Sequence, residues 1–170
     1  MSKTLYQTIV VGTDGSDLAA PTVVRAAWLA AREDADLVIV CAFTELTGRL
    51  EAKNVASMGS DARSGKVLGR GPASAALTAA VSAASAEGAT ISAALLVEGE
   101  PDAALLEIAK ERDAQLIVMG AIQDRTLVDR LLGTVAEEVT KRATCDVLLV
   151  RPAGNAARVD VSEEEPATAE

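Results

Sequence analysis

Two glycine-containing turns carry the residues of this chain that are best suited to chemistry. The turn Gly12-Thr13-Asp14-Gly15-Ser16 offers a carboxylate and two hydroxyls, and the turn Gly120-Ala121-Ile122-Gln123 offers main-chain N–H groups. A third element, Gly133-Thr134, comes directly before a predicted helix, where free N–H groups and the positive end of the helix dipole favour an anion. A carboxylate accepts hydrogen bonds from a ribose or an amino group, and N–H groups hold phosphate oxygens, so the set suits a nucleotide.

Each of these elements also has a purely structural interpretation. Gly12 and Gly15 can simply make a tight turn, Asp14 can cap the helix that follows, and Gly133-Thr134 can be an ordinary helix start. In the functional interpretation, Asp14 can also join the coordination shell of a Mg²⁺ ion. Gly120, which has no Cβ, lets the main chain approach phosphate oxygens closely.

The residues that most catalytic sites need are missing from this chain. It contains no histidine, which removes the usual general base and the commonest zinc ligand. It has no GxxxxGK[ST] loop, and Gly69-Arg70-Gly71 matches only the opening of a dinucleotide-binding loop. Cys41 and Cys145 lie in or beside apolar runs, which is typical of small buried side chains in a reducing compartment. We therefore expect no catalytic residue, no disulfide and no metal site built from side chains.

Composition narrows the classes of partner. The chain has 170 residues, a net charge of -9 and only 2% aromatic residues, so it offers neither a basic surface nor stacking platforms for nucleic acid. Its negative charge also disfavours anionic lipid, and no apolar run approaches the roughly 20 residues of a membrane helix. Since the N-terminus has no secretory h-region, we expect a cytoplasmic protein.

Apolar β-branched runs alternate with alanine-rich helical runs along most of the chain, which predicts a parallel sheet with helices on both faces. Beyond the last run, residues 153–170 are acidic and lack apolar periodicity, so they are predicted to be a disordered tail, and residues 1–152 to be one domain. Residues 44–71 contain five glycines and are predicted to form a long variable loop, with at most a short helical piece. The predicted strands are 8–11, 37–43, 91–97, 116–120 and 147–150.

The helices are predicted from caps and periodicity. The first is expected to begin at a Ser16 or Asp17 cap, the second to begin at Pro72 and end near Gly88, the third to begin at Pro101, and the last to span 134–142. The expected inner faces are Ala20, Val24, Ala27, Trp28 and Ala31 in the first helix and Leu105, Ile108 and Ala109 in the third.

Ligands of open parallel α/β sheets bind beyond the carboxyl ends of the strands. The two turns described above follow the first and fourth predicted strands, so they are expected to face one crevice. An adenine base is expected to lie there against Thr13, Ala42 and Val97, next to the main chain of the second strand.

Two stretches of this sequence resemble the universal stress protein family. IVVGTDGS at 9–16 is similar to the family's first strand and Asp-bearing turn. VMGAIQDRTLVDRLLGTVAEEVTKRATCDVLLVRP at 118–152 is similar to its ligand loop, last helix and last strand. The resemblance covers roughly 5–152 and implies a three-layer α/β/α sandwich with five parallel strands in the order 3-2-1-4-5. This fold is Rossmann-like, of the adenine nucleotide alpha hydrolase type.

The resemblance also implies a ligand. The family's ATP pattern is Gly, two residues, Gly, nine residues, then Gly followed by Ser or Thr, and here Gly120, Gly133 and Thr134 match it while Gln123 replaces the second glycine. The implied ligand is ATP, AMP or cyclic AMP, with Mg²⁺ as a possible companion. KVLGRGPAS at 66–74 is similar to an actinobacterial branch for which cyclic AMP is a ligand. The expected ligand-binding residues are Gly12, Thr13, Asp14, Gly15, Ser16, Ala42, Val97, Met119, Gly120, Gln123, Gly133, Thr134 and Val135.

In this family, the expected activity is sensing or sequestering a nucleotide in the stress response, with at most slow hydrolysis. The resemblance implies a homodimer that pairs the edge strand 147–150 with its own copy. Two alternatives stay open: a dimeric adaptor whose degenerate site does not bind ATP, and a weak ATPase that depends on Asp14 and a metal.

Overall fold

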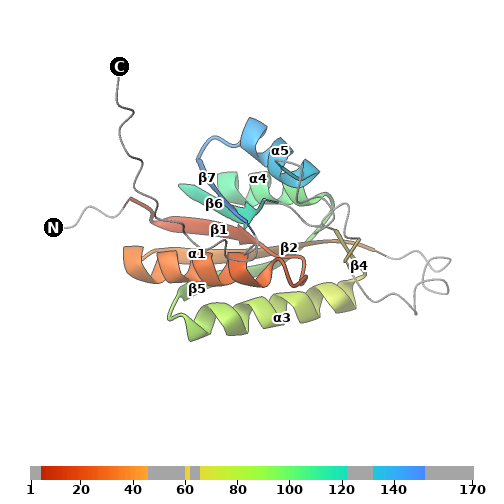
Figure 1. Ribbon diagram of the computed structural model, residues 1–170, viewed down its shortest axis with the longest axis horizontal. Helices are drawn as coiled ribbons and strands as arrows, with labels where there is room; N and C mark the ends of the chain where they lie inside the picture. The colour runs from red at the N-terminus through yellow and green to blue at the C-terminus, as the bar shows by residue number, and fades with distance from the viewer. Residues whose placement is uncertain (1–4, 46–59, 62–65, 122–131, 152–170) are drawn as a thin grey trace, which may run out of the picture.

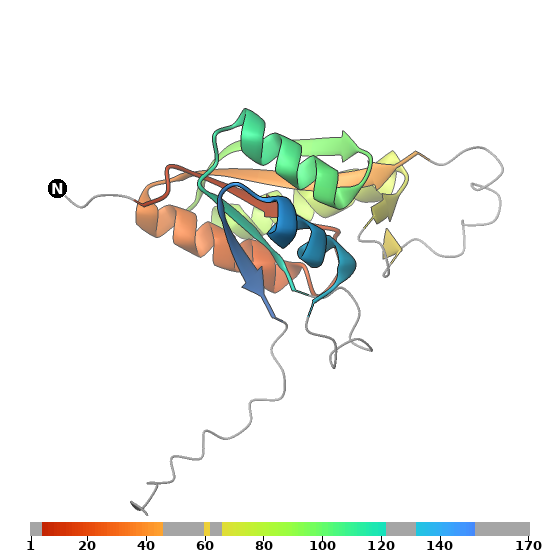
Figure 2. The same cartoon turned by 90° about the horizontal axis from the view of Figure 1, so that it is seen from above.

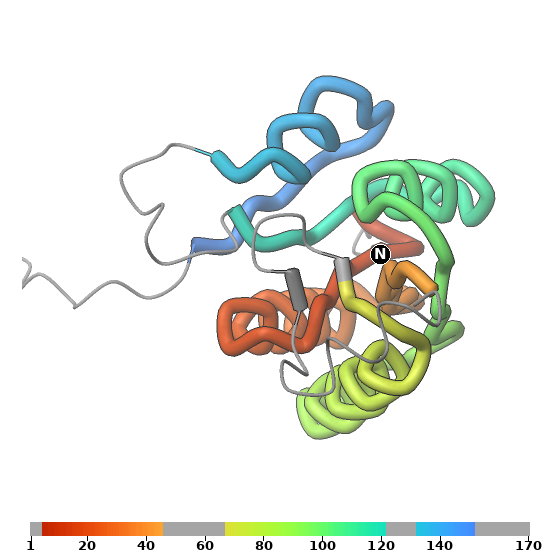
Figure 3. The backbone as a smooth tube through the Cα atoms, turned by 90° about the vertical axis from the view of Figure 1, so that its right-hand side faces the viewer, coloured from red at the N-terminus to blue at the C-terminus, as the bar shows by residue number. Residues whose placement is uncertain are grey.

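The computed structural model describes residues 5–45, 60–61, 66–121 and 132–151. These residues form three layers, with a sheet between two pairs of helices (Figure 1). The same layers are visible from the end of the sheet where β4 (Lys66–Leu68) lies (Figure 3). The three-layer α/β architecture expected from the sequence is therefore confirmed.

The centre of the sheet consists of long parallel strands, because their residues are apolar on both faces and helices cover both sides. β5 pairs with β2, β2 with β1, β1 with β6 and β6 with β7, which confirms the expected order of these strands. The strands are β1 (Thr8–Gly12), β2 (Asp36–Thr44), β5 (Thr90–Glu98), β6 (Leu116–Gly120) and β7 (Asp146–Val150).

The helices lie in two pairs on opposite faces of the sheet, α1 with α3 and α4 with α5 (Figures 1 and 2). Successive side chains of β1 follow this division: Ile9 and Val11 join the core under α1, and Val10 joins the core under α4 and α5. All three are fully buried. The helices are α1 (Ala20–Glu33), α3 (Arg70–Ala86), α4 (Pro101–Glu111) and α5 (Thr134–Arg142).

The start and the inner face of α1 differ from the prediction. Neither Ser16 nor Asp17 caps the helix, because the preceding residues form a turn of their own and the N-cap is Ala19. The buried positions are Thr22, Val23, Ala26, Ala27 and Ala30, so the true face lies about one residue away from the predicted one. Small side chains let the helix approach the sheet closely, whereas Trp28 is 45% exposed and stacks under Arg32, with 4.0 Å from the guanidinium carbon to the ring centroid.

The region 44–71 also contains more structure than predicted. β3 (Ser60–Asp61) and β4 (Lys66–Leu68) pair with each other and extend the sheet to seven strands, where five were expected. The added pairing is possible because β2 continues past its last pair with β1, Val40–Gly12, and leaves an open edge. α3 then begins at Arg70, with Pro72 inside its first turn. The rest of the predicted loop and the predicted tail 153–170 lie outside the described residues.

Candidate functional site

A pocket of about 540 Å³, counting its open mouth, lies at the carboxyl ends of β1, β2 and β6. Ligands of open parallel α/β sheets bind at this place, beyond the carboxyl ends of the strands. The two turns expected to face one crevice both contribute to it, since Asp14 and Gly120 lie in its wall. The lining residues are Gly12, Thr13, Asp14, Ser16, Leu18, Ala19, Val40, Ala42, Pro101, Leu105, Met119, Gly120 and Val135.

The turn after β1 is held by its own side chains. The Gly15 N–H donates to Thr13 Oγ1 (3.2 Å), and the Ser16 N–H donates to Asp14 Oδ1 (2.9 Å), which is the pattern of an Asx turn. The Asp14 Oδ2 atom accepts no hydrogen bond from any residue that the structure describes. Asp14 therefore lines the pocket with one carboxylate oxygen to which no described residue donates. Gly15 has a φ of 74° and is exposed, and it does not line the pocket.

The end of β6 and the start of α5 are joined by main-chain hydrogen bonds. The Ala121 N–H donates to the Val150 carbonyl (2.9 Å), and the Gly133 N–H donates to the Ala121 carbonyl (2.8 Å). Within the described part of the chain, no side chain caps α5, so its first N–H groups stay available. Val135 from this first turn lines the pocket. Gly133 and Thr134 lie beside the pocket without lining it, and Gln123 falls outside the described residues.

The wall formed by β2 differs from the expectation in one residue. Ala42 lines the pocket, but Val97 does not. Val97 pairs with Ala42 across β2 and β5, and β2 separates it from β1. Its side chain packs against the core under α4 instead. Two residues that pair across neighbouring strands therefore do not both line this pocket.

Five lining residues were not predicted: Leu18, Ala19, Val40, Pro101 and Leu105. They come from the approach to α1, from β2 and from the first two turns of α4. Pro101 and Leu105 belong to α4, which contacts β1. Leu105 lies so close to β1 that a Cβ on Gly12 would stand 3.2 Å from Leu105 Cδ2. The sequence contained a signal for Pro101 and Leu105, because in a parallel sheet the helix that follows a strand begins near the carboxyl end of that strand.

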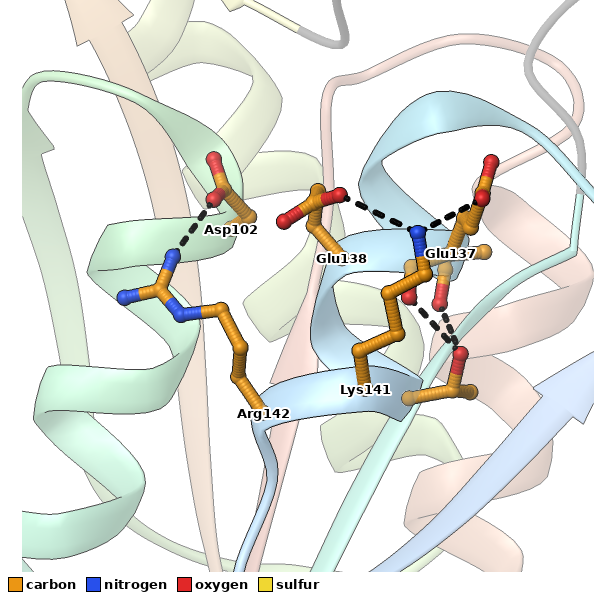
Figure 4. A network of polar contacts seen from close by, with 7 residues as sticks. Asp102, Glu137, Glu138, Lys141 and Arg142 are labelled. Carbon is orange, nitrogen blue, oxygen red and sulfur yellow. Dashed lines mark hydrogen bonds and ion pairs between the residues drawn. The ribbon is translucent and has the colours of Figure 1, made fainter.

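Charged side chains lie on the two helices α4 and α5, and one ion pair connects these helices. Arg142 of α5 donates to Asp102 of α4, with 3.2 Å between Nη1 and Oδ2 (Figure 4). Lys141 bridges Glu137 (2.7 Å) and Glu138 (3.6 Å) on α5 itself. The Lys141 hydrogen bond and charge lower the pKa of Glu137. Because most of these side chains are well exposed, they orient the two helices with little gain in stability.

The cysteines are not activated as nucleophiles. Burial, with a smaller contribution from the charge of Asp14, raises the pKa of the Cys41 thiol to about 11. Burial also raises the pKa of Cys145. Both are free thiols. Among the described residues, no group of three or more His, Cys, Asp or Glu side chains could hold a metal ion, and no helix is long and apolar enough to cross a membrane.

The parallel sheet between two helix layers, with its pocket beyond the strand ends, defines this chain as a doubly wound α/β domain. The model of the Universal stress protein family matches residues 5–151. The chain therefore belongs to the universal stress protein family.

Relatives support this assignment over nearly their whole length. Universal stress protein Rv1636 of Mycobacterium tuberculosis is 39% identical over 145 residues, which are 85% of this chain and 96% of the relative. A universal stress protein crystallised in complex with cAMP is 37% identical, with a TM-score of 0.64, over 86% of this chain and 97% of that one. The Archaeoglobus fulgidus universal stress protein in complex with dAMP is 27% identical, with a TM-score of 0.60, over 85% of this chain and 98% of that one.

Proposed function

We propose that this protein binds an adenine nucleotide in the pocket between the turn 13–16, the end of β6 and the start of α5, and that it senses or sequesters this ligand in the stress response. The observation that carries the proposal is that Asp14 and Gly120, which are far apart in sequence, line one pocket. Structures of relatives of similar fold have been solved in complex with cAMP and with dAMP, and both ligands contain adenine and a phosphate.

The pocket has chemistry for each part of such a ligand. Its inner wall is apolar, with Val40, Leu105 and Met119, and suits a base. The Asp14 Oδ2 atom can accept a hydrogen bond from a ribose hydroxyl. The Gly120 main chain and the uncapped start of α5 favour a phosphate group. We therefore assign ribose recognition to Asp14 and phosphate recognition to Gly120, Gly133 and Thr134.

Titration calorimetry with ATP, AMP and cyclic AMP tests this function on the full chain. We expect heat with at least AMP or cyclic AMP. A protein that binds none of the three would instead be the dimeric adaptor, the second candidate, which the replacement of a family glycine by Gln123 favours. Asp14→Ala should weaken binding at least tenfold, because the ribose hydroxyl would lose a charged acceptor. Asp17→Ala, outside the pocket lining, is the matched control.

Gln123→Gly addresses the choice of nucleotide. If the Gln123 side chain narrows the phosphate site, this change should increase ATP affinity more than AMP affinity. Equal effects on ATP and AMP would remove this explanation.

We propose that the site is non-catalytic, with at most slow hydrolysis. Among the described residues, the pocket lining offers one carboxylate, Asp14, and the sequence contains no histidine. A Mg²⁺ ion fits such a site only as a companion of a bound phosphate chain, since this ion is commonly held by one or two carboxylates together with phosphates. Phosphate release from ATP during long incubation, abolished by Asp14→Ala, would overturn this part of the proposal and favour the weak ATPase.

We also propose a cytoplasmic homodimer that pairs β7 with its copy. β7 has one partner strand, β6, among the described residues, and its Val147 to Leu149 side chains are only partly buried. The hydrogen bonds of Asp146 and Val150 face β6, so the alternation along a strand turns the main chain of Val147 and Leu149 outward.

Leu149→Pro removes one outward N–H and leaves the β6 side intact, which an edge strand tolerates. Size-exclusion chromatography with light scattering should show a dimer for the wild type and for Leu149→Ala, and a monomer for Leu149→Pro. A monomeric wild type would contradict the proposed dimer.

A further inference from the structure

One solvent-facing surface of α1 carries large apolar side chains. Val24 and Trp28 are four residues apart and therefore lie on the same face of the helix. Their side chains are 38% and 45% exposed. The described part of the chain exposes only three large apolar side chains, and these are two of them. Neighbouring exposed apolar side chains, unlike single ones, indicate an interaction surface.

Two arginines border this apolar pair. Arg25 and Arg32 are exposed, and neither forms an ion pair with a described residue. The Arg32 guanidinium lies over the Trp28 ring, so its charge is held beside the apolar surface. From Ala20 to Arg32 the helix contains no acidic residue, although the net charge of the chain is -9. This surface, the α1 outer face (Val24, Arg25, Trp28 and Arg32), therefore suits a segment that combines apolar and acidic residues.

The segment 152–170 of this chain has that composition. It contains five acidic residues, three of them in succession at 163–165, against one basic residue, Arg158. Its only valines, Val159 and Val161, come shortly before the acidic run, and alternate residues of an extended chain point to the same side. Two valines followed by three carboxylates are the chemical complement of the α1 outer face.

The segment also begins beside α1. β7 ends at Val150, whose buried side chain belongs to the core under α1, and the two elements are in contact (Figure 2). α1 begins at this same edge of the sheet, since Ala19 lines the pocket there. The helix covers about 12 Å from Val24 to Arg32. An extended chain advances about 3.3 Å per residue, so residues 152–163 span about 40 Å and can bring the acidic run to Arg32.

A tethered segment fits the α1 outer face better than a second copy of the protein does. The exposed surface from Pro21 to Arg32 is about 18 Å long and about 10 Å wide, which is one helix diameter. A stable dimer commonly buries about 800 Å² on each partner, much more than this surface offers. Two copies would also bring like charges together. A segment of the same chain needs less contact, because the tether gives it a local concentration on the order of millimolar.

We propose that the segment 152–170 docks on the α1 outer face of its own chain, with its two valines against the apolar pair and its acidic run beside the two arginines. This inference does not depend on the nucleotide function, because no residue of the α1 outer face lines the pocket.

Trp28 is the only tryptophan, so its fluorescence in the full chain reports on this surface. The double variant Glu163→Gln, Glu164→Gln should raise the acrylamide quenching constant at least twofold and shift the emission to longer wavelength, because fewer charges hold the segment on the arginines. The matched control is Glu107→Gln, Glu111→Gln, which removes the same charge from exposed positions of α4, on the opposite face of the sheet. The control should leave quenching and emission unchanged.

Two further measurements test whether the contact is made between these charges. Raising the salt concentration from about 0.1 M to 1 M shortens the Debye length from about 10 Å to about 3 Å, so it should increase quenching in the wild type but not in the Glu163→Gln, Glu164→Gln protein. Arg25→Gln leaves the contact of Arg32 with Trp28 in place. It should increase quenching in the wild type and have little effect in the double variant, since both changes remove the same interaction.

Three results would overturn the proposal. One is equal quenching in the wild type and in the Glu163→Gln, Glu164→Gln protein. Another is an equal increase in the α4 control, which would indicate a general effect of net charge. The third is a difference that disappears on dilution, since a segment of another copy would then cover Trp28. Failure of every nucleotide to bind would leave this inference in place.

Discussion

The contact between the turn 13–16 and α3 can be tested by adding one methyl group, at Gly15. This glycine has a φ of 74°, and a Cβ built on it would stand 2.6 Å from the Cβ of Ala76 and 3.4 Å from its Cα. Gly15→Ala is therefore expected to destabilise the protein for two separable reasons, backbone conformation and steric overlap.

Each cost can be estimated. An L-residue in the left-handed region costs about 1–2 kcal/mol, which the lower entropy of the unfolded chain offsets by about 0.4–1 kcal/mol. Carbon atoms rest about 3.5–4.0 Å apart, so the two methyl groups must separate by roughly 1 Å. Overpacking of this kind costs about 1–3 kcal/mol. Together these changes predict a loss of about 2–4 kcal/mol in the free energy of unfolding.

Gly88→Ala supplies the matched control. Gly88 has a φ of 79° and nothing within 4 Å of the position that its Cβ would occupy, so it should show the conformational cost alone, about 1 kcal/mol. Urea unfolding followed by circular dichroism measures both losses. A further variant, Ala76→Gly, should recover part of the lost free energy of unfolding when it is combined with Gly15→Ala, because it removes the opposing methyl group.

Two results would refute this reasoning. One is a Gly15→Ala loss no larger than that of Gly88→Ala. The other is a double-mutant cycle without favourable coupling between Gly15→Ala and Ala76→Gly, since the steric cost requires both methyl groups.

Other predictions concern individual polar groups. Thr22→Val should raise the free energy of unfolding by about 1 kcal/mol, because the fully buried Thr22 hydroxyl has no hydrogen-bond partner among the described residues. Thr22→Ser, which keeps the hydroxyl, is the control. A lower free energy of unfolding in Thr22→Val would contradict the argument. Cys41, whose pKa is raised to about 11, should resist a thiol reagent at pH 8 in the folded protein. Its contribution to stability, on the order of 2 kcal/mol, should be complete below the ordinary pKa of 9.0 and be lost as the pH rises through about 11; a Cys41→Ala protein with the same alkaline loss would disprove this. Arg142→Ala should cost less than about 1 kcal/mol in urea, because the Arg142 side chain in the ion pair with Asp102 is largely exposed, and a larger loss would show that this pair holds α4 against α5.

Much of the central fold could be predicted because local sequence and burial agree there. Runs such as 37–43 are apolar at every position. This pattern is typical of a strand that helices cover on both faces. Pro101 occupies the first turn of α4, where its missing N–H costs nothing, and Leu105, Ile108 and Ala109 are buried as expected. The turn 13–16 and the end of β6 were identified as neighbours because strand order and parallel direction together bring their ends to one edge.

The remaining features depend on interactions that local periodicity does not encode. The inner face of α1 differs from the predicted one because close packing on the sheet favours alanine over the larger Trp28. Val97 is excluded from the pocket because β2 separates its strand from β1. β4 is a three-residue strand in a polar, glycine-rich stretch, and it pairs with the uncovered end of β2 and with β3.

The sequence by itself determined the α/β alternation, the family and the two turns, because each of these features depends on residues that are close together along the chain. Only the tertiary structure decided which side chains line the pocket and where the inner face of α1 lies. Those properties arise where distant segments meet, and there packing and hydrogen-bond partners outweigh local preference.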